Sequence, residues 1–491
     1  MLDITVSAIG ARGVSAVALP VRSGDEGGVL VPTGWPLAEP VVAEVDEFLL
    51  DVTHPGTAGS AHILARPTRD PSHLVLVGIG DGDSGGWRDA GAAVATSAAE
   101  RLAAVTVAMP EDPTGAAARE FALGAWLAGY QFRLGSEPAT KRKLRRITLA
   151  HASTDAADTV RAAVAEARAI ADAVVLARDL TNTPSLQKSP RWFADRLSNA
   201  AARRKGVTVT VHDEVALASS GFGGLLAVGN GSARPPRLLE LSWRPRGARS
   251  HVVLVGKGIC FDSGGISIKP LDAMKLMRKD MGGAAAVCAA VLGAADLEIP
   301  VRVTALAPLA ENMVSGSAMR PGDVIRHYGG ATTEVLDTDA EGRLVLADAL
   351  AYGAKRYKPD YLVDLATLTG AQHIALGKRT AALFSDNRSL ADALQAAGDE
   401  AGEPVWPLPM PDDYLGLLRS DVADLANIGQ PSQAGAVVAA LFLREFAGDR
   451  RDRWAHIDMS APSWTDRNDG PLVKGATGWG VRILLRWLQS L

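Results

Sequence analysis

Acidic residues and a lysine with the chemistry of a metal site are concentrated in one stretch of the sequence. They are Lys257, Asp262, Asp280, Asp339 and Glu341. Four carboxylates at one place would repel one another strongly unless a highly charged cation neutralised them. Carboxylate oxygens suit Zn²⁺, Mn²⁺ or Mg²⁺, and four carboxylates with one nitrogen suffice for two ions that share bridging ligands. The stretch therefore predicts a site for two divalent metal ions.

The end of this stretch, residues 337–343, reads Asp-Thr-Asp-Ala-Glu-Gly-Arg. Asp339, Glu341 and Arg343 are spaced i, i+2, i+4, so an extended backbone would aim all three side chains in the same direction. Gly342 permits a sharp bend, and a helical composition follows it. We therefore expect a strand-to-helix turn, and the carboxyl ends of strands are where open α/β sheets bind their ligands.

Lys257 can ligate a metal only after losing its proton, because an ammonium group has no free electron pair. Lysine gives up a proton readily when it is desolvated beside positive charge, which two dications would provide. Each residue also has an ordinary alternative: a solvated loop residue for Lys257, a helix N-cap for Asp280, and turn residues for Asp339 and Glu341. These alternatives do not account for the occurrence of all five residues in one stretch.

The motifs of the stretch resemble those of the leucyl aminopeptidase family, the cytosolic dizinc exopeptidases. The chain carries, in the family's order, Gly-Lys-Gly at 256–258, Phe-Asp-Ser-Gly-Gly at 261–265, Ile-Lys-Pro at 268–270 and Asp-Met-Gly-Gly-Ala at 280–284. Residues 337–343 match the family's Asn-Thr-Asp-Ala-Glu-Gly-Arg except at Asp337, where the family has Asn. With further matches at 177–184, 364–371 and 454–458, the resemblance covers residues 177–491.

The resemblance implies a role for each of these residues. Lys257, Asp262, Asp280 and Glu341 would hold the tighter metal, and Asp262, Asp339 and Glu341 the looser one. Lys269 and Arg343 match the two catalytic residues that bind no metal, and the family holds bicarbonate on the matching arginine. Met277, Thr367, Leu368 and Gly370 would surround the first side chain of the substrate. The family assembles as hexamers.

Hydrolysis of peptides with a free N-terminus is the reaction that this site favours. Two ions ~3.5–4 Å apart can activate a bridging water and polarise the scissile carbonyl. All four carboxylates would be ligands and Arg343 cannot accept a proton, so the general base comes from elsewhere, with bicarbonate on Arg343 as the candidate. A free α-amine can complete the coordination of one ion, so we expect an aminopeptidase that prefers leucine-like residues. A two-metal phosphoesterase and an inactive, nucleic-acid-binding scaffold are the alternatives.

Asp337, the departure from the family motif, has two interpretations. An ionised carboxylate behind the ligands would strengthen the binding of a metal, and replacing it by Asn would weaken that binding. A turn residue that accepts a hydrogen bond from its own backbone would be replaced by Asn without effect. We expect the first.

The length of the chain, 491 residues, exceeds what one hydrophobic core usually serves. We expect a non-catalytic N-terminal α/β domain at 1–160 and a catalytic dimetal peptidase domain at 161–491. A run without Pro or Gly at 156–180 predicts a long helix between them. Beyond it, strand-like runs at 251–255, 301–305 and 361–364 alternate with helical runs at 282–295 and 342–357, which predicts a mixed, mostly parallel sheet flanked by helices.

The composition excludes several other classes of protein. A formal net charge of −4 gives no general attraction to nucleic acid or to anionic membranes. The longest apolar run falls short of the ~20 residues that a membrane-spanning helix needs. Two cysteines, Cys260 and Cys288, fit a reducing compartment, so we expect a cytoplasmic protein with no membrane segment.

Overall fold

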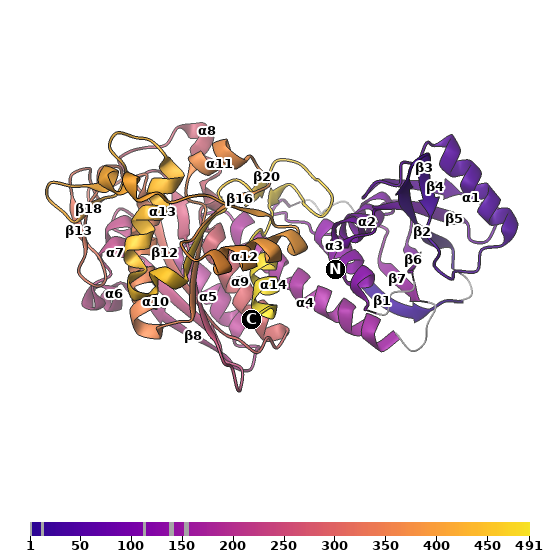
Figure 1. The fold of residues 1–491 in the computed structure, drawn as a ribbon, viewed down its shortest axis with the longest axis horizontal. Helices are drawn as coiled ribbons and strands as arrows, with labels where there is room; N and C mark the ends of the chain where they lie inside the picture. The colour runs from indigo at the N-terminus through magenta and orange to yellow at the C-terminus, as the bar shows by residue number, and fades with distance from the viewer. Residues whose placement is uncertain (1, 11–13, 111–113, 137–141, 152–156) are drawn as a thin grey trace. The chain divides into compact units, whose positions relative to one another are not determined.

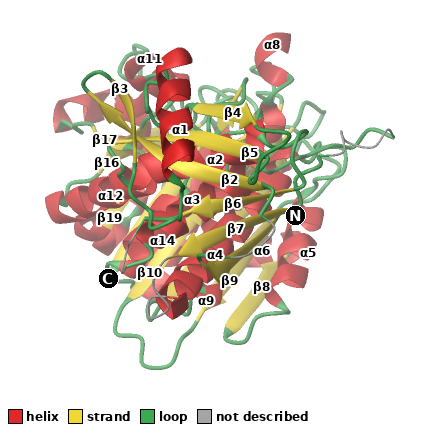
Figure 2. Ribbon diagram, turned by 90° about the vertical axis from the view of Figure 1, so that its right-hand side faces the viewer, coloured by secondary structure: helices red, strands yellow, loops and turns green. Residues whose placement is uncertain are grey.

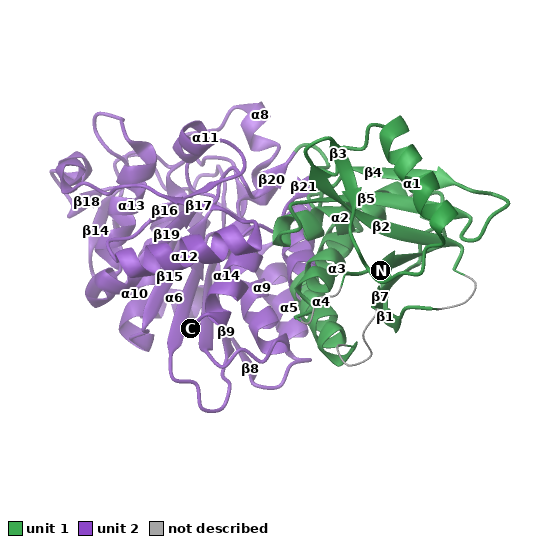
Figure 3. Ribbon diagram, turned by 45° about the vertical axis from the view of Figure 1, so that its right-hand side comes forward, with its two compact units in different colours: residues 1–172, 466–474 green, residues 173–465, 475–491 purple. Residues whose placement is uncertain are grey.

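The computed structural model describes residues 2–10, 14–110, 114–136, 142–151 and 157–491. Its contacts divide the chain into two compact units (Figure 3). Unit 1 consists of residues 1–172 and 466–474, and unit 2 of residues 173–465 and 475–491. The division after Asp172 falls within α4 (Ala157–Asn182), the long helix that also contains our predicted boundary at residue 160. The return of residues 466–474 to unit 1 is a feature that we did not predict.

A seven-stranded sheet is the centre of unit 1, in the order β1-β7-β6-β2-β5-β4 with β3 paired to β2. All pairings are parallel except those of β3 and β4. The strands are β1 (Asp3–Ala8), β2 (Ala16–Gly24), β3 (Gly27–Leu30), β4 (Ala61–Ala65), β5 (His73–Gly80), β6 (Ala104–Ala108) and β7 (Arg146–His151). The helices are α1 (Glu39–Asp51), α2 (Ser84–Ser97), α3 (Ala116–Ala128) and the first part of α4.

A nine-stranded sheet is the centre of unit 2, in the order β17-β16-β19-β15-β10-β12-β9-β8 with β11 paired to β12. Pairing is parallel except at β16–β19, β12–β9 and β8–β9. The strands are β8 (Val207–His212), β9 (Arg237–Trp243), β10 (His251–Gly256), β11 (Gly258–Asp262), β12 (Arg302–Asn312), β15 (Tyr361–Ala366), β16 (Ala381–Phe384), β17 (Val405–Pro407) and β19 (Trp454–Asp458). The predicted α/β fold with a mixed, mostly parallel sheet is confirmed.

Smaller elements complete unit 2. Two small sheets are formed by β13 (Val324–Arg326), β14 (Thr332–Glu334) and β18 (Leu425–Ala426), and by β20 (Trp464–Thr465) and β21 (Gly475–Ala476). The helices are α5 (Pro190–Ala201), α6 (Glu214–Ser220), α7 (Gly223–Gly229), α8 (Leu271–Met274), α9 (Gly282–Asp296), α10 (Glu341–Tyr357), α11 (Gly370–Leu376), α12 (Arg388–Ala401), α13 (Gly435–Phe446) and α14 (Val481–Gln489). Three 3₁₀ turns are η1 (Met277–Lys279), η2 (Asp412–Leu418) and η3 (Gly448–Arg453).

Helices α9 and α10 cover opposite faces of the large sheet. On β10, Val253 and Val255 belong to a core cluster with residues of α10, whereas a Cβ on Gly256 would touch α9 at Ala284. Successive residues of a strand point to opposite faces, so the two helices lie on different sides. Figure 1 shows α7, α10 and α13 on one side of the strands and α9 and α14 on the other. Figure 2 shows strands β4, β5, β2, β6 and β7 of unit 1 side by side, in the order of their sheet.

Helix α9 is the longest apolar run of the sequence, and it is buried around nearly its whole circumference. A helix that is apolar on all sides is typical of the interior of a large domain. Within the described part of the chain, no helix combines the length and the apolar character that crossing a membrane requires.

Strand β12 differs most from its predicted range, because it ends at Asn312 and not at residue 305. It pairs with β9 as far as Leu309 and with β11 from Leu309 to Asn312. These long-range pairings keep the chain extended through Pro308, which a local pattern treats as the end of a strand.

Candidate metal centre

The five predicted metal ligands come from segments that meet near the carboxyl ends of β10 and β11. Lys257 directly follows β10, and Asp262 is the last residue of β11. Asp280 stands between η1 and α9. Asp339 precedes α10, and Glu341 is the first residue of that helix. The position at strand ends agrees with the expected location of a ligand site in an α/β sheet.

The predicted extended backbone through residues 339–343 is wrong. Helix α10 already begins at Glu341, so Glu341 and Arg343 are helical and do not share a face in the way that alternate residues of a strand do. The helix starts one residue earlier than the predicted helical run at 342–357. Glu341 reaches the site from the first turn of the helix, where the exposed backbone N–H groups favour an acidic side chain.

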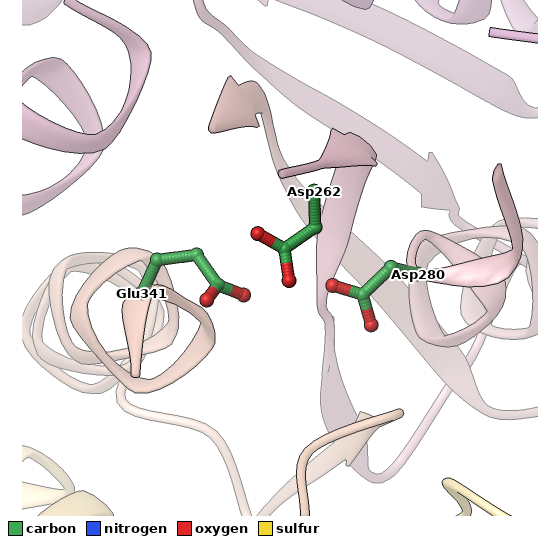
Figure 4. Close-up of side chains that lie close together, drawn as sticks. All are labelled: Asp262, Asp280 and Glu341. Carbon is green, nitrogen blue, oxygen red and sulfur yellow. The ribbon is translucent and has the colours of Figure 1, made fainter. Parts of the chain in front are cut away.

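Three buried carboxylates face one another in the centre of the site (Figure 4). Asp262, Asp280 and Glu341 each place one oxygen so that all three oxygens lie within 4.8 Å of one another. Both carboxylate oxygens of Glu341 are buried, and among the described residues Oε2 has no hydrogen-bond partner. Buried carboxylates at such distances require positive charge between them. The cluster therefore fits a divalent cation.

Two lysines supply positive charge to these carboxylates. Lys257 Nζ lies 2.9 Å from Asp280 Oδ2 and 2.9 Å from Glu341 Oε1. Lys269 Nζ lies 2.8 Å from Asp262 Oδ2 and also pairs with Asp339. Lys269 thus brings Asp339, the fourth predicted carboxylate ligand, next to the other three. All five predicted ligands meet in one place.

The shifted pKa values of the groups in the site also indicate that the carboxylates require positive charge nearby. Burial, together with the charge of Asp262, raises the pKa of Glu341 to about 8 and that of Asp339 to about 6. Burial would lower the pKa of Lys257, but the carboxylates of Asp280 and Glu341 outweigh it and raise this pKa. Oxygen atoms from four acidic residues and one amine nitrogen are a donor set that suits Zn²⁺, Mn²⁺ or Mg²⁺.

A cavity of about 340 Å³ opens beside the carboxylates. Its lining includes the predicted ligands Lys257, Asp339 and Glu341, the predicted catalytic residues Lys269 and Arg343, and the predicted substrate contacts Leu368 and Gly370. Apolar side chains of Ile428 and Val438 also line it. A space with metal-binding oxygens at one end and apolar walls can hold the first residue of a peptide.

Arg343 is positioned to hold an anion in this cavity. Its Nη1 donates to the backbone oxygen of Asn427 at 2.7 Å, and its buried Nε has no hydrogen-bond partner among the described residues. Burial lowers the pKa of Arg343 to about 10, and the nearby carboxylate of Glu341 acts in the opposite direction. The guanidinium is therefore charged at neutral pH.

We predicted that Thr367 and Met277 contact the substrate, but neither residue lines this cavity. The Thr367 hydroxyl donates to Asp280 Oδ1 at 2.7 Å, and its backbone oxygen accepts from Lys257 Nζ at 3.1 Å. Thr367 therefore holds two of the predicted metal ligands. Met277 is partly exposed in η1, three residues before Asp280.

Asn312, which we did not predict, connects two of the metal-binding segments. It is buried at the end of β12, directly opposite Asp262 in the pairing with β11. Its Nδ2 donates to Asp262 Oδ1 at 2.9 Å and to the backbone oxygen of Thr338 at 3.0 Å. The amide therefore orients Asp262 and fixes the backbone next to Asp339. Its only signal in the sequence is a polar residue at the end of an apolar run.

Two further side chains outside our predicted set hold the loops of the site. Asp458 accepts hydrogen bonds from the backbone N–H groups of Leu368 and Thr369, which line the cavity. Asn427 Oδ1 accepts hydrogen bonds from the backbone N–H groups of Leu336 and Asp337, at the start of the motif at 337–343. Each is distant in sequence from the loop that it holds, so spacing could not reveal it.

Asp337 makes the backbone hydrogen bond that its turn interpretation predicts, and it also lines the cavity beside the carboxylates. Its Oδ1 accepts a hydrogen bond from the backbone N–H of Asp339 at 2.9 Å, two residues further along. An asparagine oxygen makes the same bond. The carboxylate of Asp337 also acts on Arg343, whose pKa it raises against the lowering by burial.

Gly342 is required by the close approach of Lys257. A Cβ at position 342 would lie 2.6 Å from Lys257 Cε and 2.7 Å from Nζ. Any larger residue would push the lysine away from the carboxylates. The glycine at position 342 therefore serves packing within the first turn of α10.

Comparison with known proteins shows the family to which the chain belongs. The family model described as "Cytosol aminopeptidase family, catalytic domain" matches residues 175–485. A protein of Corynebacterium glutamicum called "Probable cytosol aminopeptidase" is 41% identical, over 91% of this chain and 88% of its own length. The chain belongs to the cytosol aminopeptidase family. The resemblance drawn from the motifs is confirmed, and the protein is a metal-dependent aminopeptidase.

Two more relatives support membership of this family. A "Probable cytosol aminopeptidase" of Mycobacterium tuberculosis is 41% identical, over 98% of this chain and 95% of its own length. The solved structure of the "Bottromycin maturation enzyme BotP in complex with Mn" has a TM-score of 0.84 and 35% identity. The match covers 97% of this chain and 99% of that one, so the similarity includes both units.

Proposed function

We propose that this aminopeptidase uses two divalent metal ions to release leucine-like residues from the N-terminus of peptides. The observation that carries the proposal is the cluster of buried carboxylates from Asp262, Asp280 and Glu341, with oxygens within 4.8 Å of one another. Asp339 joins them through Lys269. Four carboxylates and one amine nitrogen suffice for two ions that share bridging ligands.

We assign the tighter ion to Lys257, Asp262, Asp280 and Glu341, and the looser ion to Asp262, Asp339 and Glu341. When bound, the two ions supply an activated water and a polarised carbonyl. Ligation by Lys257 requires a neutral amine, which the charge of bound dications favours over the ammonium form. Manganese and zinc are the candidates, with magnesium a third. The Mn in the BotP structure is consistent with manganese.

Arg343 and Lys269 are the proposed catalytic residues of this chain. Arg343 holds a small oxyanion such as bicarbonate against the cavity, and that anion accepts the proton. The place of Arg343 in the lining of the cavity and the charge of its guanidinium support this role. Lys269 lines the same cavity and stabilises the negative charge that develops on the carbonyl oxygen.

The preference for leucine-like residues rests on the apolar walls of the cavity. Leu368, Ile428 and Val438 line it together with Gly370, which leaves space for a side chain. The family resemblance supports a substrate contact for Met277, and Thr367 acts by holding Asp280. The free α-amine of the peptide approaches the carboxylate end of the cavity.

The assembly and location of the enzyme are also proposals. The family resemblance supports a hexamer. The curated relatives are named as cytosol aminopeptidases, which supports a cytoplasmic enzyme. Both cysteines, Cys260 and Cys288, are free and buried, which is consistent with a reducing compartment.

Release of aniline from leucine anilide tests the proposed function. We expect turnover of leucine anilide and little turnover of its N-acetylated form, because acetylation removes the amine that the site recognises. Aspartate anilide serves as the control for the apolar pocket and should be a poor substrate. Equal turnover of the acetylated compound would refute the exopeptidase assignment, and hydrolysis of a phosphate monoester alone would favour the phosphoesterase.

A further inference from the structure

Lys188 is a fully buried lysine that the proposed catalytic machinery does not use. It lies between α4 and α5, outside the motifs that define the metal centre. Its Nζ donates to the backbone oxygens of Leu180 and Thr181, each at 3.0 Å, and of Arg278 at 2.6 Å. The sulfur of Met281 lies 3.2 Å away. One ammonium group therefore joins the end of α4 to the segment that carries Asp280.

The three carbonyl partners require the charged form of this lysine. An ammonium group has three N–H bonds, whereas a neutral amine has two, so only the charged form can donate to all three oxygens. Burial lowers the pKa of Lys188 to about 7. Hydrogen bonds to the carbonyl oxygens act in the opposite direction and favour the ammonium form. Leu180 and Thr181 belong to the last turn of α4, whose backbone oxygens have no partners within the helix.

Arg278 connects Lys188 to the metal centre. It is the middle residue of η1, which begins with Met277 and is followed by Asp280. Met281, the fourth neighbour of Nζ, follows Asp280 directly. Lys188 thus contacts the chain on both sides of one metal-binding carboxylate. Asp280 is also the only carboxylate that we assign to the tighter ion alone.

The loop before Lys188 is fixed to the other side of the same centre. The Ser185 hydroxyl donates to the backbone oxygen of Cys260 at 2.6 Å, two residues before Asp262. Arg234 Nη1 donates to the backbone oxygen of Ser185 at 2.7 Å and pairs with the buried Glu311. These hydrogen bonds fix the loop that carries Lys188, so that the lysine can hold η1 in place.

We propose that Lys188 is a positioning residue, which holds η1 so that Asp280 meets the tighter metal ion and Met277 meets the substrate. The inference rests on the proposed function and deepens it. Lys188 acts through Asp280 and Met277 and touches neither metal nor substrate. Its loss should affect the tighter ion and the substrate pocket and should leave the looser ion bound.

Calorimetric titration of Mn²⁺ into the metal-free full chain tests this role. The variants are Lys188→Met, which removes all donors, and Lys188→Gln, which keeps two N–H bonds. We expect Lys188→Met to weaken the tighter ion ~10–100-fold, the range for residues that orient a metal ligand, with the looser ion unchanged. The KM for leucine anilide should rise, and Lys188→Gln should fall between Lys188→Met and the wild type.

Arg482→Met is the matched control. Arg482 is another buried cation of unit 2, which pairs with Glu403 at 3.1 Å, and neither residue lines the cavity described above. Its replacement should leave the Mn²⁺ titration unchanged. Equal weakening in Arg482→Met would show general destabilisation and overturn the positioning role.

The remaining outcomes separate this inference from the proposed function. A folded Lys188→Met variant with wild-type Mn²⁺ affinity would overturn the inference alone. If neither Lys188 variant folds, the lysine is a structural residue and the positioning role is rejected. A wild-type protein that binds no Mn²⁺ and no Zn²⁺ would overturn the proposed function, and this inference with it.

Discussion

Arg343 and Lys269 are the two residues whose chemistry can be separated from metal binding. We predict that Arg343→Ala and Lys269→Ala each lower the turnover of leucine anilide by roughly 10²–10³-fold, the range for losing one oxyanion donor or acid–base group. Both variants should retain the metal content of the wild type. Metal analysis of the purified variants checks the assignment, since a variant that lacks one metal equivalent would have lost a ligand and not a catalytic group.

Replacing Asp337 tests whether its charge or its turn geometry matters at the start of the motif at 337–343. Its carboxylate accepts the backbone N–H of Asp339 at 2.9 Å, and Asn can accept the same bond. We therefore predict that titrations of Zn²⁺ and Mn²⁺ into Asp337→Asn superimpose on those of the wild type. Weaker binding of one ion in the variant would restore our original interpretation that the negative charge supports a metal.

Strand pairing explains what the sequence could and could not predict at the level of elements. The ranges of α9, α10 and β10 follow from local composition, and the ligand motifs could be recognised because each is a short continuous run. Asn312 could not be recognised in this way, because its function depends on standing opposite Asp262 in β11, and strand register is a long-range property. The helical start at Glu341 was missed because Gly342 suggested a bend, whereas the approach of Lys257 is what requires a glycine there.

The pairing of β11 with β12 gives a prediction for both ions. Asn312→Leu removes the amide that donates to Asp262 Oδ1 and to the Thr338 backbone. Because Asp262 is assigned to both metals, we predict that affinity for both falls ~10–100-fold, unlike the loss at one site expected for Lys188→Met. Asn230→Leu is the control, since Asn230 donates to the Ser317 backbone and does not contact a predicted ligand. Unchanged affinity in Asn312→Leu would show that Asp262 is oriented without this amide.

At the scale of the whole molecule, the property to be measured is the number of chains that associate in solution. We predict a hexamer in solution from the family resemblance. Sedimentation equilibrium at micromolar concentration measures the mass directly. A mass equal to that of a single chain would contradict the hexamer and would leave the metal centre, which lies within unit 2, unaffected.

Dependence on divalent metal is the central property of the whole enzyme. The most direct measurement follows leucine anilide hydrolysis before chelation, after removal of metal by a chelator and dialysis, and during readdition of Mn²⁺ or Zn²⁺. We predict that activity is lost on chelation and returns as two equivalents of metal bind per chain, with Asp280→Asn failing to recover. Full activity in the metal-free protein would contradict catalysis at the carboxylates of Asp262, Asp280 and Glu341.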